Sequence, residues 1–564
     1  MVDYHINNKF GDAFKGAAIG VSIGERNQLA EFAKVLRGGA QMAEIDIASV
    51  YGLLNEGGNS AVTIGKAERE AIGHLAEATK ADLSIHAPWA INFSGINPQS
   101  GEKDAQYGNL VTNEVREAVK FADDVSQNMG KKNMPIIFHA SSDHFGSPDK
   151  SAGVMAYDNS EEKVVPIKSH KYSMDLKQFS DIYGDDTLQT LKKVDGGKGV
   201  QEVSAQDDRN KKYVVLSPSA ELEFLKVQHR KNLNQELVGM ETSKYNLGLQ
   251  RRELLNELAA ANIKGDLSRI EQLSKNKEAI DQMEKQLEVK KKEIELQAND
   301  LNNRFLPFDE KAPSLAAVGI KNAALESMKT KTRPMILVEN TMTPDMSLSN
   351  PAETAKSVQI AREMFVGEVA KKYGMSKSEA KALSEELIGI NLDIGHANVF
   401  KSYINPQTGK PYSDKDIVEM SLAAKDYIKR YHLNDNMGST DAHLPLGEGN
   451  APVKEIYEAL RKAGVEAPAI MEVFGGLGGS DVGFSQSLQY IGAPIYGDVP
   501  YVSLPSYAGQ PYSSLMGDYS SYSNLGLKND MFPYGGFSGI FPALGGGYME
   551  NNKGGGGFSG APMV

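Results

Sequence analysis

The chain of 564 residues contains no cysteine. Without cysteine there is no disulfide, no thiolate metal ligand and no cysteine nucleophile, so any bound metal must be held by His, Asp or Glu. No run of 18 apolar residues occurs, which argues against a membrane span. The N-terminus also lacks the basic segment followed by an apolar one that marks a secretory signal. We therefore expect a cytoplasmic protein that does not cross a membrane.

Basic residues are also scarce relative to acidic ones, since the formal net charge is −12. A negative surplus is unfavourable for coating DNA generally, but it leaves room for a local basic groove. A hydrophobic content of 40% and a charged content of 24% are typical of soluble globular proteins. The length exceeds what one ordinary core needs, so we expect one large domain with appendages.

Eight short apolar runs, rich in β-branched residues, alternate with amphipathic stretches of helical period. Near-continuous apolar runs indicate strands whose two faces are both buried under helices. Eight such strands alternating with helices predict an α/β fold, a (β/α)8 TIM barrel. An open doubly wound sheet is the alternative that counting strands leaves open. The runs cover residues 17–24, 42–48, 82–88, 134–140, 334–340, 388–396, 428–435 and 468–474.

Two segments interrupt this alternation. We predict that residues 1–144 and 313–493 form the two halves of the barrel, with an insertion at 145–312. The insertion begins with a polar, mixed stretch and becomes strongly helical at about 219–303. The final segment, 494–564, is rich in Gly, Tyr, Ser and Pro with few charges. That composition predicts a disordered, low-complexity tail.

The helical part of the insertion predicts an antiparallel hairpin of two long arms. Gly265 can end the first arm, and Ser268 with Glu271 fits a capping box for the second. Met283 occupies the companion position of a coiled-coil seam. The seven-residue repeat of that seam consists of Ile280, Leu287, Ile294 and Leu301. Such a hairpin serves as a solvated strut, as a self-association arm, or as a clamp for a protein or nucleic-acid partner.

Nine acidic and imidazole side chains lie at the ends of predicted strands or in the loops directly after them. In a parallel barrel all strand C-termini open on one face, so these side chains would converge at one mouth. Any single histidine at a strand end is more often a hydrogen-bonded structural residue than a ligand. The nine are His86, His139, Glu339, Asp393, His396, His432, Asp441, His443 and Glu472.

Their number and chemistry together predict a metal site. Burying several carboxylates side by side without cations is severely unfavourable. Mixed imidazole and carboxylate ligands suit zinc, manganese or iron. Asp441 and His443 are two residues apart, so in an extended segment both point the same way and can reach one ion. Nine ligands at three or four per ion amount to two or three metals.

Several strings around these residues resemble the endonuclease IV family of apurinic/apyrimidinic endonucleases, which are xylose isomerase-like TIM barrels. The strings are "SIHAPWAIN" at 84–92, "FHA" at 138–140, "LVENT" at 337–341, "LDIGHA" at 392–397, "HLND" and "DAHLPLGEGN" within 432–450, and "ME" at 471–472. The resemblance covers about 15–140 and 334–492, and all nine ligand positions carry the family's residue types.

The resemblance implies three Zn2+ ions, with Mn2+ as the alternative metal. One ion would be held by His86 and His139 and would share Glu339 with the second. The second would also take Asp393, His432 and Glu472, and the third would take His396, Asp441 and His443.

It also implies an activity: phosphodiester hydrolysis at abasic sites in DNA, as a step of DNA repair. Glu339 and Glu472 would be the catalytic carboxylates, with Glu472 orienting a water activated by metal for in-line attack on phosphorus. Trp89 and Asn92, in the first string, would contact the substrate. The DNA-handling positions differ from the family, since Ala90 replaces a leucine and the loop after residue 48 lacks an expected arginine and glutamine.

Two other functions are compatible with the sequence. Sugar isomerases and epimerases of the same superfamily resemble this chain in Glu339, Asp393, His432 and Glu472, which alone can bind one divalent ion and move a proton beside a carbonyl. An arginine near position 443 would favour that activity, whereas His443 and His139 favour hydrolysis. A non-catalytic scaffold, in which the hairpin and tail carry the function, is the third possibility.

Overall fold

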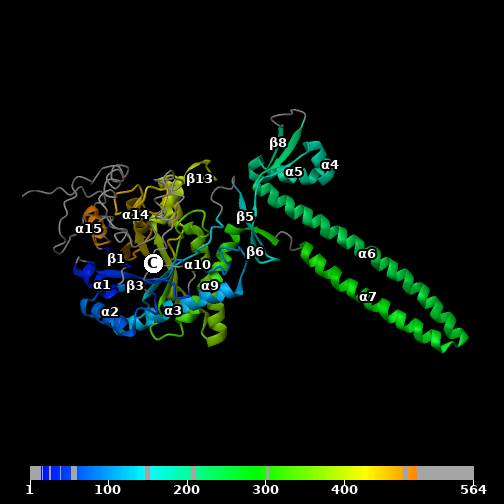
Figure 1. Ribbon diagram of the computed structural model, residues 1–564, viewed down its shortest axis with the longest axis horizontal. Helices are drawn as coiled ribbons and strands as arrows, with labels where there is room; N and C mark the ends of the chain where they lie inside the picture. The colour runs from blue at the N-terminus through cyan, green and yellow to red at the C-terminus, as the bar shows by residue number, and fades with distance from the viewer. Residues whose placement is uncertain are drawn as a thin grey trace, which may run out of the picture. The chain divides into compact units, whose positions relative to one another are not determined.

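The computed structural model describes residues 14, 17–24, 27–37, 40–51, 60–146, 153–204, 211–299, 304–473 and 480–491. The chain divides into two compact units (Figure 1). One comprises Met1–Asp149 with Phe308–Val564, and the other comprises Lys150–Pro307. The predicted tail at 494–564 lies outside the described residues.

The first unit contains a closed barrel of eight parallel strands. Each of the eight runs predicted from the sequence contains one barrel strand, so the TIM barrel is confirmed and the open sheet is excluded. Around the ring the strands are β1 (Ile19–Ile23), β16 (Ala469–Met471), β15 (Ile428–Leu433), β12 (Ile388–Asp393), β11 (Met335–Glu339), β4 (Pro135–His139), β3 (Asp82–His86) and β2 (Met42–Asp46).

The pairing register of the strands brings polar residues side by side at the C-terminal end of the barrel. Glu339 lies opposite His139 in the ladder between β11 and β4. His432 lies opposite Asp393 in the ladder between β15 and β12. Elsewhere the barrel strands are largely apolar and buried, which is why each run lacks the alternation of a half-exposed strand.

Helices surround the barrel, and several have ends specified by the sequence. α3 begins after Asp104, whose side chain accepts from Gln106 N, and ends at Gly130 with φ 65°. α11 begins with a capping box between Ser376 and Glu379. The helices of this unit are α1 (Gln28–Arg37), α2 (Lys66–Thr79), α3 (Ala105–Met129), α9 (Phe308–Ser327), α10 (Pro351–Tyr373), α11 (Lys377–Leu387), α12 (Ile394–Asn398), α13 (Asp414–Leu422), α14 (Val453–Lys462) and α15 (Ser480–Tyr490).

The second unit contains two small antiparallel sheets that the polar, mixed composition did not predict. One has the order β10-β5-β6 and the other β7-β9-β8. The strands are β5 (Val154–Asp158), β6 (Lys163–Ile167), β7 (His170–Tyr172), β8 (Val200–Ser204), β9 (Lys212–Leu216) and β10 (Phe305–Pro307). In the ladder between β5 and β10, Asp158 lies opposite Phe305, so the two ends of the insertion are joined.

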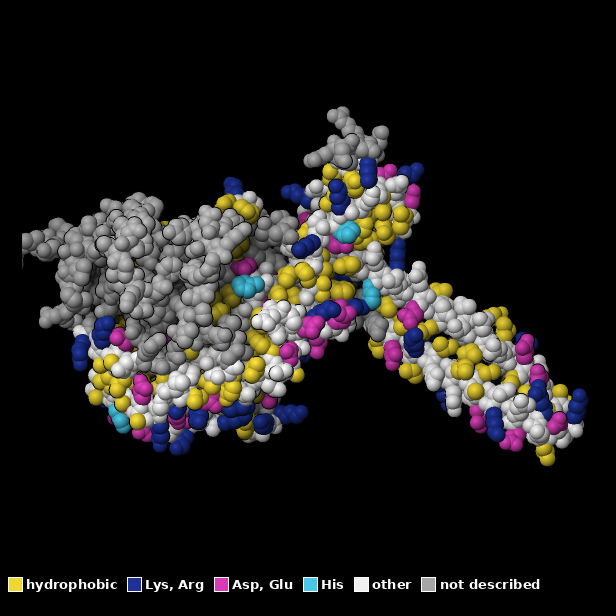
Figure 2. Space-filling view, viewed as in Figure 1, with side chains coloured by type: hydrophobic (Ala, Val, Ile, Leu, Met, Phe, Trp, Pro, Cys, Tyr) yellow, Lys and Arg dark blue, Asp and Glu magenta, His cyan; other side chains and the backbone are white. Residues whose placement is uncertain are grey.

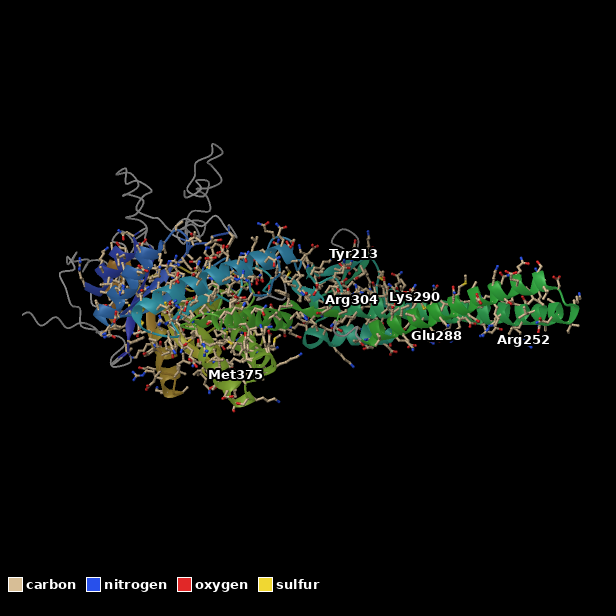
Figure 3. The ribbon with its side chains drawn as sticks, turned by 90° about the horizontal axis from the view of Figure 1, so that it is seen from below. Tyr213, Arg252, Glu288, Lys290, Arg304 and Met375 are labelled. Carbon is tan, nitrogen blue, oxygen red and sulfur yellow. The ribbon has the colours of Figure 1, made fainter. Side chains whose placement is uncertain are left out.

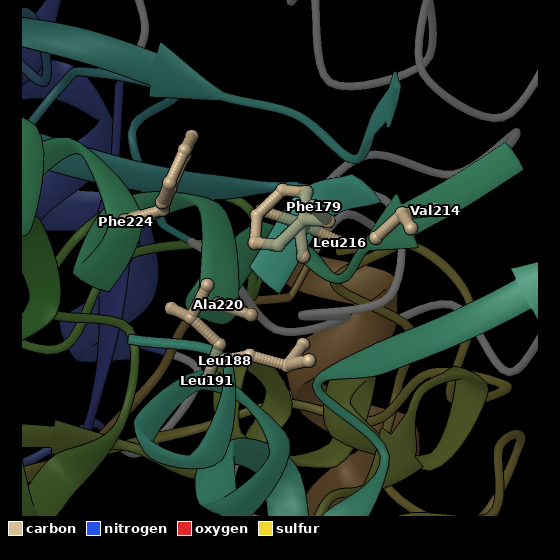
Figure 4. Packing of buried hydrophobic residues seen from close by; sticks show 7 residues of the cluster. All are labelled: Phe179, Leu188, Leu191, Val214, Leu216, Ala220 and Phe224. Carbon is tan, nitrogen blue, oxygen red and sulfur yellow. The ribbon is translucent and has the colours of Figure 1, made fainter. Parts of the chain in front are cut away.

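A separate hydrophobic core holds the β7-β9-β8 sheet against three helices (Figure 4). These helices are α4 (Leu176–Tyr183), α5 (Asp185–Lys193) and the first turns of α6. The core residues are Phe179, Leu188, Leu191, Val214, Leu216, Ala220 and Phe224. The unit therefore has a core of its own and is more than a pair of helices.

The predicted hairpin is formed by α6 (Pro218–Lys264) and α7 (Leu267–Asn299), which lie side by side (Figure 1). α6 ends at Gly265, whose φ of 70° suits glycine, as predicted. The predicted cap of α7 was wrong: Asp266, rather than Ser268, accepts from Arg269 N at 3.1 Å. Asp266 follows the glycine directly, so its carboxylate reaches the first turn sooner. No helix in the described ranges is long and apolar enough to cross a membrane.

The seam of the hairpin is half apolar and half charged. Ile294 packs with Leu233 and Met240, and Leu287 packs against this cluster. The companion position expected at Met283 was wrong, because this side chain is 52% exposed. The second row of α7 is instead charged and lies one residue further along, at Lys277, Glu284 and Lys291. Arg251 of α6 pairs with Glu284 at 3.2 Å, and Figure 3 shows the charged side chains along both arms.

Gly20 offers a test of the barrel packing. A Cβ at this position would lie 2.1 Å from Met42 Cγ and 2.5 Å from Met42 O. The carbonyl belongs to the neighbouring strand and cannot move away, so we expect Gly20→Ala to destabilise the protein by about 1–3 kcal/mol. Thermal unfolding by circular dichroism measures the effect. Gly108→Ala is the matched control, since nothing lies within 4 Å of it in helix α3 and alanine should stabilise it slightly. Equal melting temperatures for the two variants would contradict this packing.

Candidate metal centre

The nine residues singled out in the sequence come together at the C-terminal end of the barrel. Five imidazole rings form a continuous cluster, with neighbouring ring centroids between 5.1 and 6.0 Å apart. The carboxylates fill the spaces between them: His86 Nε2 lies 3.5 Å from Glu339, and His396 Nε2 lies 3.1 Å from Asp441.

Within the cluster the donor atoms fall into groups that could each hold an ion. In each group one donor atom per residue lies within 4.8 Å of the others. Glu339, His86, His432 and Glu472 each belong to two of the groups, so these four residues link three of them. The groups are His86 with His139 and Glu339; Glu339 with Asp393, His432 and Glu472; His396 with Asp441 and His443; and an overlapping set of His86, His432 and Glu472.

Three of the histidines are oriented by backbone carbonyls. The Nδ1 atoms of His86, His396 and His443 lie 2.7–3.0 Å from the carbonyl oxygens of Ala87, Asn340 and Glu472. When Nδ1–H donates to a carbonyl, the lone pair is on Nε2, which is the nitrogen directed at the carboxylates. The backbone of His443 also has a φ of 45°, in the left-handed region that residues other than glycine rarely adopt.

His432 presents the opposite nitrogen. Its Nδ1 lies 3.0 Å from Glu472 Oε2 and 3.2 Å from Glu339 Oε1. Its Nε2 faces the interior of the barrel, 2.7 Å from Glu44 Oε1. Glu44 in turn accepts a hydrogen bond from Ser84 at 2.7 Å, and Arg430 donates to the same serine. The buried carboxylate of Glu44 therefore fixes the direction in which His432 points.

Amide side chains hold two of the carboxylates in place. Asp393 Oδ1 accepts from the backbone N of His396 at 2.7 Å, and its Oδ2 accepts from Asn434 Nδ2 at 2.8 Å. Asn391 Nδ2 donates to Glu339 Oε2 at 3.1 Å. These hydrogen bonds hold each carboxylate in one orientation, as is usual for carboxylates that bind a metal ion.

The charges of the cluster perturb its pKa values strongly. Burial lowers the pKa of His139 to about 3, so this imidazole is neutral at pH 7. For His86 burial acts in the same direction, but contact with Glu339 and the charges of Glu472 and Glu44 outweigh it and raise the pKa to about 10. Burial raises the pKa of Asp393 to about 7. Without cations, the site must balance its carboxylates with protons on imidazoles.

Several buried atoms of the cluster suit metal ions better than they suit each other. Five of them make no hydrogen bond of good geometry among the described residues, although His432 Nε2 and Glu472 Oε2 each lie within 3.0 Å of an ionic neighbour. The five are His86 Nε2, His139 Nδ1, His432 Nε2, Asp441 Oδ1 and Glu472 Oε2. Unpaired polar atoms are costly when buried, and each of these belongs to a candidate ligand group. Nitrogen and carboxylate donors without sulfur fit zinc or manganese.

The two residues expected to contact substrate lie in different surroundings. Trp89 is 40% exposed, as a side chain that meets a ligand at the mouth would be. Asn92 is completely buried, and its amide donates to Asp143 Oδ2 and to Ile96 O. Asp143 also accepts from Ser347, in the loop after the adjacent strand β11, so Asn92 takes part in joining the loops that follow β3, β4 and β11.

Sequence reasoning missed several residues that support the cluster. Glu44, Asn391 and Asn434 all contact candidate ligands, and all three are buried. Glu44 had a usable signal, because a carboxylate inside the apolar run 42–48 has to be paired. The asparagines had none, since nothing in their local sequence distinguishes them from loop or strand residues.

Comparison with known proteins agrees with the fold. Residues 349–491 match the family described as xylose isomerase-like TIM barrel, which supports that family for the second half of the barrel. A stretch of 92 residues is 33% identical to the uncharacterized protein MJ1311 of Methanocaldococcus jannaschii, covering 16% of this chain and 28% of that protein. The chain thus spans less than a third of this relative.

A crystal structure of a D-tagatose 3-epimerase-like protein aligns over 84% of this chain and 98% of its own, with 12% identity and a TM-score of 0.34. Similarity at that level carries no argument about activity. The superfamily is mostly enzymatic, includes both endonuclease IV and sugar epimerases, and typically binds divalent metals.

Metal content tests the grouping of ligands. We expect about three zinc ions per chain, measured by elemental mass spectrometry on protein purified without chelator and supplied with zinc. His443→Ala should lower this to about two, because His443 belongs to one group only. His144→Ala is the matched control, since His144 pairs with Asp345 and lies outside all four groups. Equal zinc content in the two variants would contradict the assignment of His443.

Proposed function

We propose that this protein is a metal-dependent phosphodiester hydrolase of the endonuclease IV type. The observation that carries the proposal is the group formed by His396, Asp441 and His443, which lies beside the tetrad that contains Asp393. A single-metal enzyme needs only the tetrad. The group of His396, Asp441 and His443 goes beyond what one ion needs, and His139 belongs to a third group with His86 and Glu339. Several ligand groups side by side support a site in which more than one metal ion binds the phosphate.

Metal ions in such a site supply charge neutralisation at the phosphoryl oxygens and lower the pKa of a water. The protein supplies the proton acceptor. Glu472 is the most exposed of the four carboxylates in the groups, with 14% of its side chain accessible, against 10% for Asp441 and none for Glu339 and Asp393. Burial would raise its pKa, but His443 and His432 lower it, so it is ionised at neutral pH. Glu472 therefore meets an incoming water and takes its proton.

Glu339 has a different role in this proposal. It is completely buried, and burial would raise its pKa, but His432 and His86 hold the pKa well below the ordinary value. Because Glu339 is completely buried and accepts a hydrogen bond from Asn391, it anchors the centre, while Glu472 takes the proton.

The identity of the phosphodiester is a separate question. DNA with abasic sites is the substrate that the sequence motifs favour, and duplex DNA is bound mainly through Lys and Arg contacts to phosphates. In the described loops at the barrel mouth the cations are Lys103, Lys401 and Lys410, and Lys401 already pairs with Asp414 at 2.6 Å. Grip on duplex DNA by these loops alone would be weak, so small diesters belong in the same assay.

A single-metal sugar isomerase or epimerase is the second candidate. It is favoured by the tetrad of Glu339, Asp393, His432 and Glu472, whose atoms form a complete group without the others. It predicts about one manganese, magnesium or cobalt ion per chain and no hydrolysis of diesters. Metal content together with assays on an abasic-site duplex, bis(p-nitrophenyl) phosphate and ketohexoses separates the two activities.

Glu472→Gln tests the proposed proton acceptor. We expect kcat for diester hydrolysis to fall by about 10²- to 10⁴-fold, the usual contribution of a positioned base, while KM changes little. Glu448→Gln, in the loop after β15 and outside the ligand groups, is the matched control and should keep its activity. Zinc content is measured on both variants, so that lost metal is not mistaken for a lost base. An unchanged kcat in the Glu472 variant would remove this residue from the mechanism.

A further inference from the structure

Two opposite charges lie inside the barrel, close below the candidate ligands. Glu44 is completely buried and Arg430 is 3% exposed, whereas Figure 2 shows Lys, Arg, Asp and Glu side chains spread over the surface of the molecule, where such groups are usual. Arg430 precedes His432 by two residues on β15, so it belongs to the layer of side chains directly below this ligand. The interior of a TIM barrel is generally filled by Val, Ile and Leu. The two charges at this position therefore call for an explanation.

A serine connects the two charges across the barrel. The guanidinium of Arg430 donates to Ser84 Oγ at 2.5 Å, and Ser84 Oγ donates to Glu44 Oε2 at 2.7 Å. Ser84 is completely buried and lies opposite Glu44 in the ladder between β2 and β3. Strands β15 and β3 are on opposite sides of the ring, so the side chain of Arg430 crosses the interior. The three residues form a hydrogen-bonded chain from one wall of the barrel to the other.

Glu44 brings this chain into contact with a candidate ligand. Its Oε1 lies 2.7 Å from His432 Nε2, outside the angles of a good hydrogen bond, so the contact is mainly electrostatic. The other ring nitrogen, Nδ1, faces Glu472 at 3.0 Å and Glu339 at 3.2 Å, within the tetrad. A carboxylate beside the far nitrogen of a metal-binding imidazole fixes the ring and makes the near nitrogen a stronger donor. The charge of Glu44 therefore acts on the atom that would hold an ion.

Packing alone does not account for the charged chain. Apolar side chains of similar volume generally stabilise a protein interior at least as well as a buried ion pair does, because buried charges lose their hydration. The positions two residues before the candidate ligands of β11 and β4 belong to the same layer of the barrel. They carry Leu337 and Ile137, which are apolar and completely buried. The charged chain lies instead on the side of His432, the ligand that Glu44 contacts.

We propose that Glu44 is a positioning residue of the metal centre, and that its negative charge raises the affinity for the ion bound through His432. Ser84 and Arg430 hold this carboxylate in place, and the arginine offsets a charge that would be costly to bury alone. The inference rests on the metal centre of the proposed function and extends that centre into the barrel interior.

The zinc affinity of Glu44→Gln tests the role of the charge. Glutamine keeps the size of the side chain and removes its charge, so E44Q should bind one of its zinc ions about 10- to 100-fold more weakly, the usual loss for such a partner. Competition with a chromophoric zinc chelator, on full-length protein purified free of metal, measures the affinity. Glu114→Gln is the matched control and should bind zinc as the wild type does. Glu114 is also buried, at 1% exposed, but it accepts from the backbone N of Val50 and Tyr51 and lies outside the ligand groups.

Two further variants separate positioning from folding. Glu44→Asp keeps the charge and should lose less affinity than E44Q. Ser84→Ala removes only the hydroxyl that holds Glu44 and should weaken the same ion, which provides the test should E44Q not fold. Thermal unfolding of each metal-free variant is followed by circular dichroism. A purely structural role would lower the melting temperature of E44Q and leave the zinc affinity of the folded protein unchanged, and that result would overturn the proposal.

The wild-type titration separates this inference from the proposed function. A wild-type protein that binds no zinc would overturn the metal centre and the role of Glu44 together. Wild-type zinc affinity in both E44Q and S84A would overturn the role of Glu44 alone and leave the metal centre standing.

Discussion

The feature on which the site depends is the register between neighbouring strands of the barrel. Glu339 and His139 are side by side in one ladder, and Asp393 and His432 in another. A shift of one residue in either ladder would turn a carboxylate from the interior to the helix layer. The dense packing of imidazole and carboxylate at the mouth thus follows from how apolar strand residues below it align.

That arrangement explains why the barrel and its candidate ligands could be predicted from the sequence. Strands buried on both faces are written as apolar runs, and a parallel barrel puts all their C-termini on one face. What could not be predicted depends on contacts across the barrel. The pairing of Glu44 with His432 joins β2 to β15, and no local pattern records such a contact. The sequence likewise does not predict that a backbone carbonyl orients His86, since every residue has a carbonyl.

The insertion shows the same division between local and long-range information. Gly265 ended its helix where the sequence said it would, because a left-handed residue acts on its own turn. Met283 was misplaced because an apolar residue was expected in the seam, where the structure has charges paired across the arms, such as Arg251 with Glu284. The strands of the small sheets in the insertion are short and mixed in polarity, so the alternation of apolar and polar residues is too short to predict a strand. Their stability comes from the core around Phe179.

The ladder between β5 and β10 has a consequence for how the barrel folds. It pairs Asp158 with Phe305, so a segment of roughly 150 residues begins and ends at adjacent positions. Once this ladder has formed, pairing β4 with β11 closes only the two short segments that connect them to the insertion. The entropy lost is therefore smaller than for closing one long loop. The sequence between β5 and β10 can therefore change in length without changing the entropic cost of closing the barrel.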